Sequence, residues 1–239
     1  MLNKINRQYF VTGTDTEIGK TLVAGALILL LREHFERVAG FKPVAAGMYR
    51  NANGQLVNED IETLMLASGL SIPVSELCAY QLEQAVAPHL AAAQMGIELK
   101  CNVMLAAYQQ LSQQVDAVIV EGAGGFLVPL NTAMNLADLV ELLDIPVILV
   151  VGMRLGCLNH ALLTVAAIEQ RGLKLAGWVA NGLHPQMPLL TENIKSLQER
   201  ITAPLLGVVD CLPPELQKCG NTPYSLSALE FAKKSLKLP

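Results

Sequence analysis

Six short runs of apolar residues recur along the chain, separated by longer stretches in which apolar residues follow helical spacing. The short runs are almost continuously apolar instead of alternating, as strands that are covered on both faces should be. The pattern therefore predicts six buried β-strands, at Tyr9–Thr12, Val38–Pro43, Ala117–Val120, Val147–Val151, Ala176–Ala180 and Leu205–Val209.

The stretches between these runs predict helices, at Gly19–Glu33, Glu59–Ala67, Val103–Gln113, Asn135–Leu142, Leu158–Arg171 and Leu189–Ile201. Strand followed by helix, repeated, is typical of an α/β fold with a parallel β-sheet flanked by helices on both faces. Ligands of such a sheet collect at the carboxyl ends of its strands. We expect a single domain over residues 1–239 and a surface loop from Pro213 onward, and residues 48–99 have a less regular pattern apart from the helix predicted at Glu59–Ala67.

Composition narrows the classes of function open to the chain. Apolar residues make up 52% and charged residues 16%, which predicts a large core and the partly apolar surface that oligomers cover. The formal net charge of −4 argues against nucleic acid as a partner. The longest apolar run, Leu22–Leu31, is too short to span a bilayer, so we expect no membrane segment.

The cysteines bear on the cellular compartment. Five are scattered along the chain without a C-x-x-C pair, which predicts reduced thiols in a cytoplasmic protein. The first ten residues, MLNKINRQYF, lack the apolar stretch of a signal peptide and lead directly into the first predicted strand.

A loop with the sequence GTDTEIGKT joins the first predicted strand to the first predicted helix. Glycines let backbone N–H groups face inward, and a helix N-terminus adds partial positive charge, so such a loop can cradle phosphates. Lys20 is placed to reach the β- and γ-phosphates, and the Thr21 hydroxyl to bind Mg²⁺. Five residues, not four, separate Gly13 from Gly19, yet the flanking strand and helix are the context that the motif requires. We interpret the fold as P-loop NTPase-like.

Two acidic residues and a second lysine are expected at the same edge of the sheet as this loop. Glu121 ends a strand and precedes small residues, which predicts a carboxylate that faces the phosphate loop and can bind Mg²⁺. On pattern alone, Asp60 fits a helix N-cap as well as a metal ligand. Lys42 fits a surface lysine as well as a cation that stabilises a transferring phosphoryl group. The helix start at residues 156–159 fits a carboxylate site as well as an ordinary helix start.

Seven segments in order resemble the dethiobiotin synthetase family of biotin biosynthesis: GTDTEIGKT, GFKPVAAG, NED, APH, VEGAGG, IPVILVVGMRLGCLNHA and LAGWVAN. The similarity runs in register from about residue 7 to residue 212. The long spacing of the phosphate loop is itself the family's form. Seven motifs in one order are far more specific than any single motif.

This resemblance implies an ATP-dependent cyclo-ligase that works as a homodimer, with Mg²⁺ as cofactor and ATP as co-substrate. CO₂ would add to a nitrogen of 7,8-diaminononanoate as a carbamate, and ATP would phosphorylate that carbamate. The second amine would then close the cyclic urea, so that the products are dethiobiotin, ADP and phosphate.

The resemblance also implies roles for particular residues. Lys20, Lys42 and Thr16 would be catalytic, and the Mg²⁺ ligands would be Thr21, Asp60 and Glu121. The residues around ATP and its metal would be Glu17, Ile18, Gly19, Lys20, Thr21, Leu22, Asp60, Glu121, Gly122, Ala123, Gly124, Asn181, Gly182, Val209, Asp210 and Cys211. The diamine would meet Ala46 and, across the dimer interface, Gly156, Cys157, Leu158 and Asn159.

Three positions depart from the family's pattern. Ala46 stands where the family often has a hydroxyl residue, so a substrate hydrogen bond there would be absent or made by the backbone. Asn193 falls where some members have a tyrosine, which bears on how a partner subunit binds the substrate carboxylate. The segment VVDCLPP lacks the proline and tryptophan of some relatives, which leaves the nucleotide preference open.

A rival of a different class is an ATP-switched, partner-binding ATPase of the partitioning type, which shares this general fold. Such proteins typically carry an additional lysine near the start of the phosphate loop, where this chain has Thr14, Asp15 and Thr16. Another amide-forming ligase of the same superfamily would often carry a glutaminase domain, for which this chain has no room. The retained lysines and acids argue against a non-catalytic relative.

Overall fold

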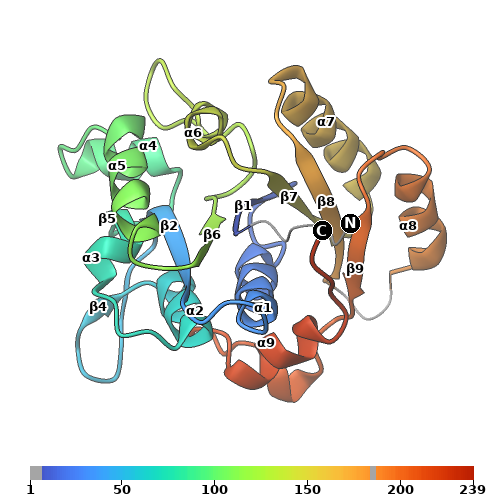
Figure 1. Cartoon of the computed structure of the whole chain (residues 1–239), viewed down its shortest axis with the longest axis horizontal. Helices are drawn as coiled ribbons and strands as arrows, with labels where there is room; N and C mark the ends of the chain where they lie inside the picture. The colour runs from blue at the N-terminus through green and yellow to red at the C-terminus, as the bar shows by residue number, and fades with distance from the viewer. Residues whose placement is uncertain (1–6, 184–186) are drawn as a thin grey trace.

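The computed structural model of the protein describes residues 7–183 and 187–239. Within them, seven strands form one parallel sheet in the order β5, β2, β6, β1, β7, β8, β9 (Figure 1). The strands are β1 (Gln8–Gly13), β2 (Val38–Ala46), β5 (Cys78–Leu82), β6 (Ala117–Glu121), β7 (Val147–Met153), β8 (Leu175–Gly182) and β9 (Leu205–Val209). A separate antiparallel hairpin pairs β3 (Tyr49–Arg50) with β4 (Leu56–Val57).

Helices cover both faces of this sheet (Figure 1). On one face lie α1, α2 and α9; on the other lie α5 and α6, with α7 and α8 packed together over the β7–β8 side. Their bounds, with the short α3 and α4 and the 3₁₀ turn η1, are α1 (Lys20–Leu31), α2 (Glu59–Ser68), α3 (Val74–Leu77), α4 (Pro88–Gln94), α5 (Cys101–Ser112), α6 (Leu136–Leu143), α7 (Cys157–Gln170), α8 (Leu190–Gln198), η1 (Pro214–Leu216) and α9 (Leu226–Lys233).

The continuous apolar runs of the sequence follow from this layering. Successive side chains of a strand point to opposite faces of the sheet, so a strand with helices on both faces buries every one of them. In β1, Tyr9 and Val11 join the core beneath α1, while Phe10 joins the core beneath α5 and α6. All three are 1% exposed or less.

The six predicted strands and six predicted helices are confirmed, each within a few residues at its ends. Besides the predicted helix α2, residues 48–99 contain the hairpin, the short helices α3 and α4, and the edge strand β5, none of which the sequence predicted. This strand reads Cys-Ala-Tyr-Gln-Leu and is only partly buried, because a strand at the edge has one neighbour instead of two. Its sequence therefore lacks the continuous apolar signal of the central strands.

The prediction of a surface loop from Pro213 onward is wrong for its last part, where helix α9 packs on α1. Ala228, Leu229 and Ala232 of α9 are fully buried. A Cβ atom at Gly25 of α1 would come within 2.7 Å of the Leu229 side chain, so a small residue is required there for the two helices to approach. The packing fixes the C-terminal end of the chain beside the phosphate loop's helix.

Candidate active site

The phosphate loop lies where the sequence predicts it, between the end of β1 and the start of α1. Gly19, the N-cap of α1, has a φ of 83° in the left-handed region that glycine adopts without strain. A Cβ atom at this position would also lie 2.1 Å from the Nδ2 atom of Asn181. Both the positive φ and the lack of space for a Cβ atom therefore require glycine at this position of the phosphate loop.

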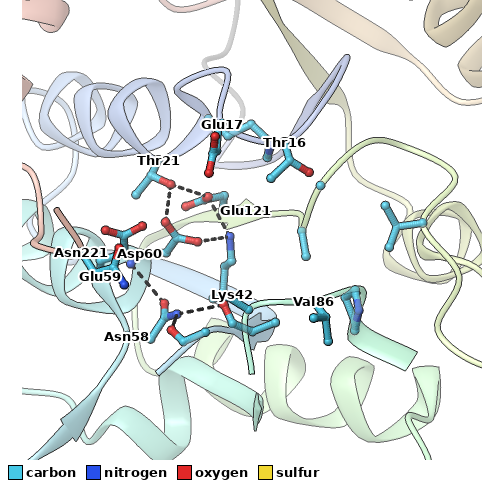
Figure 2. A pocket seen from close by; sticks show the side chains of 18 of the residues that line it. Thr16, Glu17, Thr21, Lys42, Asn58, Glu59, Asp60, Val86, Glu121 and Asn221 are labelled. Atoms are coloured by element: carbon cyan, nitrogen blue, oxygen red, sulfur yellow. Dashed lines mark hydrogen bonds and ion pairs between the residues drawn. The ribbon is translucent and has the colours of Figure 1, made fainter. Parts of the chain in front are cut away.

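The strand order explains why residues from distant parts of the sequence meet here. Because β2, β6 and β1 are neighbours and parallel, the segments that follow them emerge at the same edge of the sheet. These segments enclose a cavity of about 840 Å³ (Figure 2). Of the site residues predicted from the sequence, those that line this cavity are Thr16, Glu17, Gly19, Lys20, Thr21, Lys42, Ala46, Asp60, Glu121, Ala123 and Gly124.

Lys42 is the centre of the polar network in this cavity (Figure 2). Its Nζ atom lies 2.8 Å from Asp60 Oδ2 and 2.8 Å from Glu121 Oε1, and it donates to the Gly122 carbonyl at 3.1 Å. The sequence places Lys42 near the end of its strand, but β2 continues to Ala46, so Lys42 lies inside the strand. It is 3% exposed, which excludes the alternative of a solvated surface lysine.

The protonation states follow from this geometry. Burial alone would lower the pKa of Lys42, but the carboxylates of Asp60 and Glu121 outweigh burial and raise it above its ordinary value. Burial would likewise raise the pKa of Asp60, yet the charge and hydrogen bond of Lys42 lower it to about 2. Burial raises the pKa of Glu121, against the opposing effect of Lys42. Lys42 is therefore a buried cation at neutral pH, and Asp60 an ionised carboxylate.

Asp60 is not the N-cap of its helix, which resolves the alternative that the pattern leaves open. The N-cap of α2 is Asn58, whose Oδ1 atom accepts from the backbone N–H groups of Asp60 and Ile61. The Nδ2 atom of Asn58 donates to the Gly47 carbonyl at 2.9 Å, beyond the end of β2. Asn58 thereby ties the α2 start to the strand that carries Lys42, and the Asp60 side chain is left free to point at the cavity.

The residues predicted to hold magnesium converge. Thr21 Oγ1 lies 2.7 Å from Asp60 Oδ1 and 2.8 Å from Glu121 Oε1, although a hydroxyl has one hydrogen and can donate to only one of them. Glu121 Oε2 is buried without a hydrogen-bond partner among the described residues. Crowded oxygens and an unsatisfied carboxylate oxygen are the environment that a hard divalent cation fits.

These ligands leave coordination positions for other donors. Across residues 7–183 and 187–239, no cluster of three or more His, Cys, Asp or Glu side chains is arranged to hold a metal by itself. A hydroxyl and two carboxylates fit Mg²⁺, which is commonly bound by one or two carboxylates together with phosphate and water oxygens. The donor set thus fits a metal that arrives with a nucleotide.

Lys20 lies at the mouth of the phosphate loop, where its Nζ atom donates to the backbone carbonyl of Asp15 at 2.7 Å. Burial, followed by the nearby charge of Lys42, lowers the pKa of Lys20 to about 8. Asp15 in turn pairs with Arg154, which follows β7. This pair links the phosphate loop to the loop before α7.

Five of the residues predicted for the nucleotide form a second group beside the phosphate loop. Asn181 ends β8, and its Nδ2 atom donates to the Ile18 carbonyl at 2.8 Å. Gly182 packs closely against the backbone of residues 209–211, since a Cβ atom on it would lie 2.9 Å from the Cys211 nitrogen. This group and the buried Ile18, Leu22 and Gly122 support the loop but are not among the cavity's lining residues.

The helix start that was assigned to the substrate lies outside the cavity. Gly156, with a φ of 93°, is the N-cap of α7, and residues 157–159 form its first turn. Leu155 just before it is fully exposed. Asn193 donates to the Leu189 carbonyl within α8 and takes no part in the cavity. Within a single chain, residues 156–159 and Asn193 therefore do not line the cavity at the phosphate loop.

Sequence reasoning missed the wall of the cavity opposite the phosphate loop. Its additional lining residues come from the residue after β2, the start of α2, the loop before α4, the turn after β6 and the C-terminal segment, namely Gly47, Asn58, Glu59, Ala85, Val86, Ala87, Pro88, Val128, Pro129, Lys218, Gly220, Asn221 and Tyr224. The APH motif could have signalled the residues from the loop before α4. The C-terminal residues carry no local pattern, because only the packing of α9 on α1 brings them here.

The parallel sheet, the glycine–lysine loop and the convergent hydroxyl and carboxylates define a P-loop nucleotide-binding protein. A family model described as an AAA domain matches residues 7–217. Curated relatives make the assignment more specific. The chain is 52% identical to the ATP-dependent dethiobiotin synthetase BioD of Aromatoleum aromaticum over 203 residues, which cover 85% of this chain and 90% of the relative. It is 50% identical to the protein of the same name from Cellvibrio japonicus, over 85% of this chain and 89% of that one.

The chain therefore belongs to the ATP-dependent dethiobiotin synthetase family, whose members are ligases. Solved structures support the fold alone. A ParA family ATPase from Chlorobium tepidum aligns with a TM-score of 0.52 at 11% identity, covering 97% of this chain and 89% of that one. Cobyrinic acid a,c-diamide synthase from Mycobacterium smegmatis aligns with a TM-score of 0.50 at 16% identity, over 96% and 92%. Within the described residues, every helix is too short or too polar to cross a bilayer.

Proposed function

We propose that the protein converts 7,8-diaminononanoate, CO₂ and ATP to dethiobiotin, ADP and phosphate. The observation that carries the proposal is the convergence of Lys20 and Lys42 with Asp60 and Glu121 in one cavity under the phosphate loop. Two cations beside a phosphate cradle suit a reaction in which negative charge moves between a carboxylate-like group and a phosphoryl group. The names of relatives about half identical to this chain point to the same reaction.

The first step is formation of a carbamate. The lone pair of one substrate nitrogen attacks the carbon of CO₂, a C–N bond forms, one C=O π bond becomes a carboxylate, and the nitrogen loses a proton to solvent. The protonated Nζ of Lys42 stands in the cavity wall where the resulting anion is stabilised. Because Lys42 is buried and held by two carboxylates, it keeps its position without being rearranged during the step.

The second step transfers the γ-phosphoryl group. A carbamate oxygen attacks the γ-phosphorus, the bond to the β–γ bridging oxygen breaks, and ADP leaves with a carbamic–phosphoric mixed anhydride as the other product. Lys20 is placed at the phosphate loop to stabilise the charge on the transferring group. Its Nζ donates to the Asp15 carbonyl at the phosphate loop, an acceptor whose place a phosphate oxygen would take.

The third step closes the ring. The second amine attacks the carbonyl carbon of the mixed anhydride, phosphate leaves with the electron pair of the C–O bond, and the nitrogen loses a proton. The protein forms no covalent bond in this scheme, so its contribution is orientation and charge stabilisation. Thr16 and Glu17 line the cavity beside the lysines and are proposed to orient the reacting groups.

Magnesium and ATP recognition complete the proposal. Thr21, Asp60 and Glu121 would hold Mg²⁺, which when bound neutralises charge on the phosphates. Asn181 and residues 209–211 would contact the adenine side of ATP, and Ala46 would line the diamine site. We place the protein in the cytoplasm, which agrees with five free thiols, one of them exposed.

The test uses purified protein with ATP, Mg²⁺, the diamine and labelled bicarbonate. We expect ATP consumption only when diamine and bicarbonate are both present, together with a labelled cyclic urea. ATP hydrolysis at the same rate without the diamine would contradict a ligase and favour an ATP-switched protein of the partitioning type. The comparison of matched samples with and without the diamine separates the two classes directly.

We further propose that the protein is a homodimer that pairs through the outer face of α7. Leu155 is fully exposed and Leu163 is 63% exposed, and Asn159 and Ala166 lie exposed along the same helix. Exposed large apolar side chains such as Leu155 and Leu163, one just before α7 and one on it, are typical of an interface. In a twofold dimer it would bring the α7 start of one subunit toward its partner, where residues 156–159 would bind the substrate carboxylate.

Leu163→Glu is expected to convert the dimer to a monomer. Each interface would lose two buried leucines and gain two unpaired charges, so dimerisation should weaken by at least about 100-fold. Light scattering coupled to size-exclusion chromatography measures the mass directly. Leu226→Glu, at an exposed leucine of α9, is the matched control and should leave the mass unchanged. A wild-type chain that is monomeric at micromolar concentration would contradict this proposal.

A further inference from the structure

The segment that joins β9 to α9, residues 210–225, forms part of the cavity wall and is here called the C-terminal strap. One end follows the sheet strand β9, and the other is anchored by the packing of α9 on α1. Between these ends, Lys218, Gly220, Asn221 and Tyr224 line the same cavity as the phosphate loop. Figure 2 shows Asn221 among the residues that line the pocket, which also include Glu59 and Thr21.

The strap is fastened to the first two turns of α2. Lys218 Nζ lies 2.6 Å from Glu59 Oε2, and the two side chains are 23% and 29% exposed. The backbone N–H of Tyr224 donates to Thr63 Oγ1 at 3.1 Å, and Thr63 in turn donates to the Glu59 carbonyl at 2.7 Å. The Lys218 ammonium also lies 5.0 Å from the centre of the Tyr224 ring, within the range of a cation–π contact.

Glu59 is a carboxylate for which the proposed reaction has no use. It lines the cavity next to Asp60, but Lys42 is already engaged by Asp60 and Glu121. Without Lys218, Glu59 would add an unpaired negative charge to the wall of a cavity that must accept a triphosphate. Charges of like sign a few ångströms apart in a partly buried site repel strongly.

We infer that Lys218 is a positioning residue that neutralises Glu59 and fastens the α2 start, so that the cavity admits the phosphates of a nucleotide. The inference rests on the proposed function in that it takes the cavity to bind a nucleoside triphosphate. Lys218 acts through Glu59 and not by contact with the reacting atoms. The C-terminal strap is thereby a working part of the site, although it lies far along the chain from the phosphate loop.

The first test replaces Lys218 with methionine, which keeps the packing on Tyr224 and removes the charge. Binding of the non-hydrolysable ATP analogue AMP-PNP with Mg²⁺ is measured by calorimetry on the full chain. We expect the dissociation constant of Lys218→Met to rise by about tenfold. Lys233→Met is the matched control, since Lys233 also ties the C-terminal region to another part of the chain, through an ion pair with Glu33 in the turn after α1. It should bind the analogue as the wild type does.

The second test removes both members of the pair. If Lys218 acts by neutralising Glu59, the double variant Glu59→Gln, Lys218→Met should recover affinity to within about threefold of the wild type. Hydrogen exchange at the amides of residues 59–63 should rise in Lys218→Met, because the strap then holds α2 at one point instead of two. Neither readout depends on turnover.

Three outcomes would overturn the inference. Wild-type affinity in Lys218→Met would remove Lys218 from the site altogether. A double variant as weak as the single one would show that Lys218 acts on the nucleotide itself. A wild-type chain that does not bind AMP-PNP at all would overturn the proposed function, and this inference with it. The wild-type measurement therefore distinguishes the two failures.

Discussion

Lys42→Met is expected to lower kcat by about 100- to 1,000-fold, the effect of removing one charge-stabilising donor from an active site. Lys42 is a buried cation, 2.8 Å from both Asp60 and Glu121, and methionine replaces its length without its charge. Steady-state release of ADP in the presence of diamine and bicarbonate measures the change. Lys100→Met, at an exposed lysine that pairs with Glu98, is the control and should be near wild type.

Loss of stability has to be separated from loss of catalysis in this variant. Removing Lys42 leaves the carboxylate of Glu121 buried without its cation, which costs about 3–5 kcal/mol in comparable cases. The double variant Lys42→Met, Glu121→Gln should regain much of the lost stability but none of the lost rate. A near wild-type rate in Lys42→Met, with the chain folded, would remove Lys42 from the reaction.

Glu121→Gln is expected to raise the Mg²⁺ concentration needed for half-maximal ATP consumption by more than about tenfold. The variant removes the charge of a carboxylate that is completely buried and has an oxygen without a partner among the described residues. Magnesium titrations of ATP consumption, and electron paramagnetic resonance of Mn²⁺ bound in the presence of ADP, both report the change. The control is Glu141→Gln, at a glutamate of α6 that pairs with Arg171, and it should change neither the Mg²⁺ titration nor the Mn²⁺ spectrum. An unchanged Mg²⁺ requirement in Glu121→Gln would place the metal elsewhere.

The central strands could be predicted from the sequence because burial on both faces of the sheet requires apolar residues at nearly every position of a strand. A strand with helices on both faces must be apolar at every position, and β1, β6 and β7 are apolar throughout or nearly so. The edge strand β5 was not predicted because three of its five residues are not fully buried, so its sequence is not continuously apolar. The helix α9 escaped because its buried face has three small or branched residues after a long polar stretch.

The residues of the candidate site likewise fall into those that a local sequence pattern predicts and those that it does not. The phosphate loop is contiguous in sequence, so its glycines, lysine and threonine form a recognisable local pattern. Glu121, at the end of a buried strand and before small residues, could also be predicted to face this loop, but Lys42 and Asp60 carry no such pattern. On residue type alone, Lys42 fits the surface and Asp60 a helix cap, and the family resemblance was needed to favour the metal and phosphate roles. The structure brings all three together through the neighbouring positions of β2 and β6 and the cap made by Asn58.

By itself, the sequence determined the α/β class, the positions of the buried strands along the chain and the phosphate loop, because these depend on interactions within one segment or on burial of single residues. Only the tertiary structure decided that Lys42 is a buried cation, that Asn58 and not Asp60 caps α2, and that Lys218 meets Glu59 across 159 positions of the chain. Contacts between segments so distant depend on how the sheet orders its strands and how α9 packs, and no local pattern of residues encodes that arrangement.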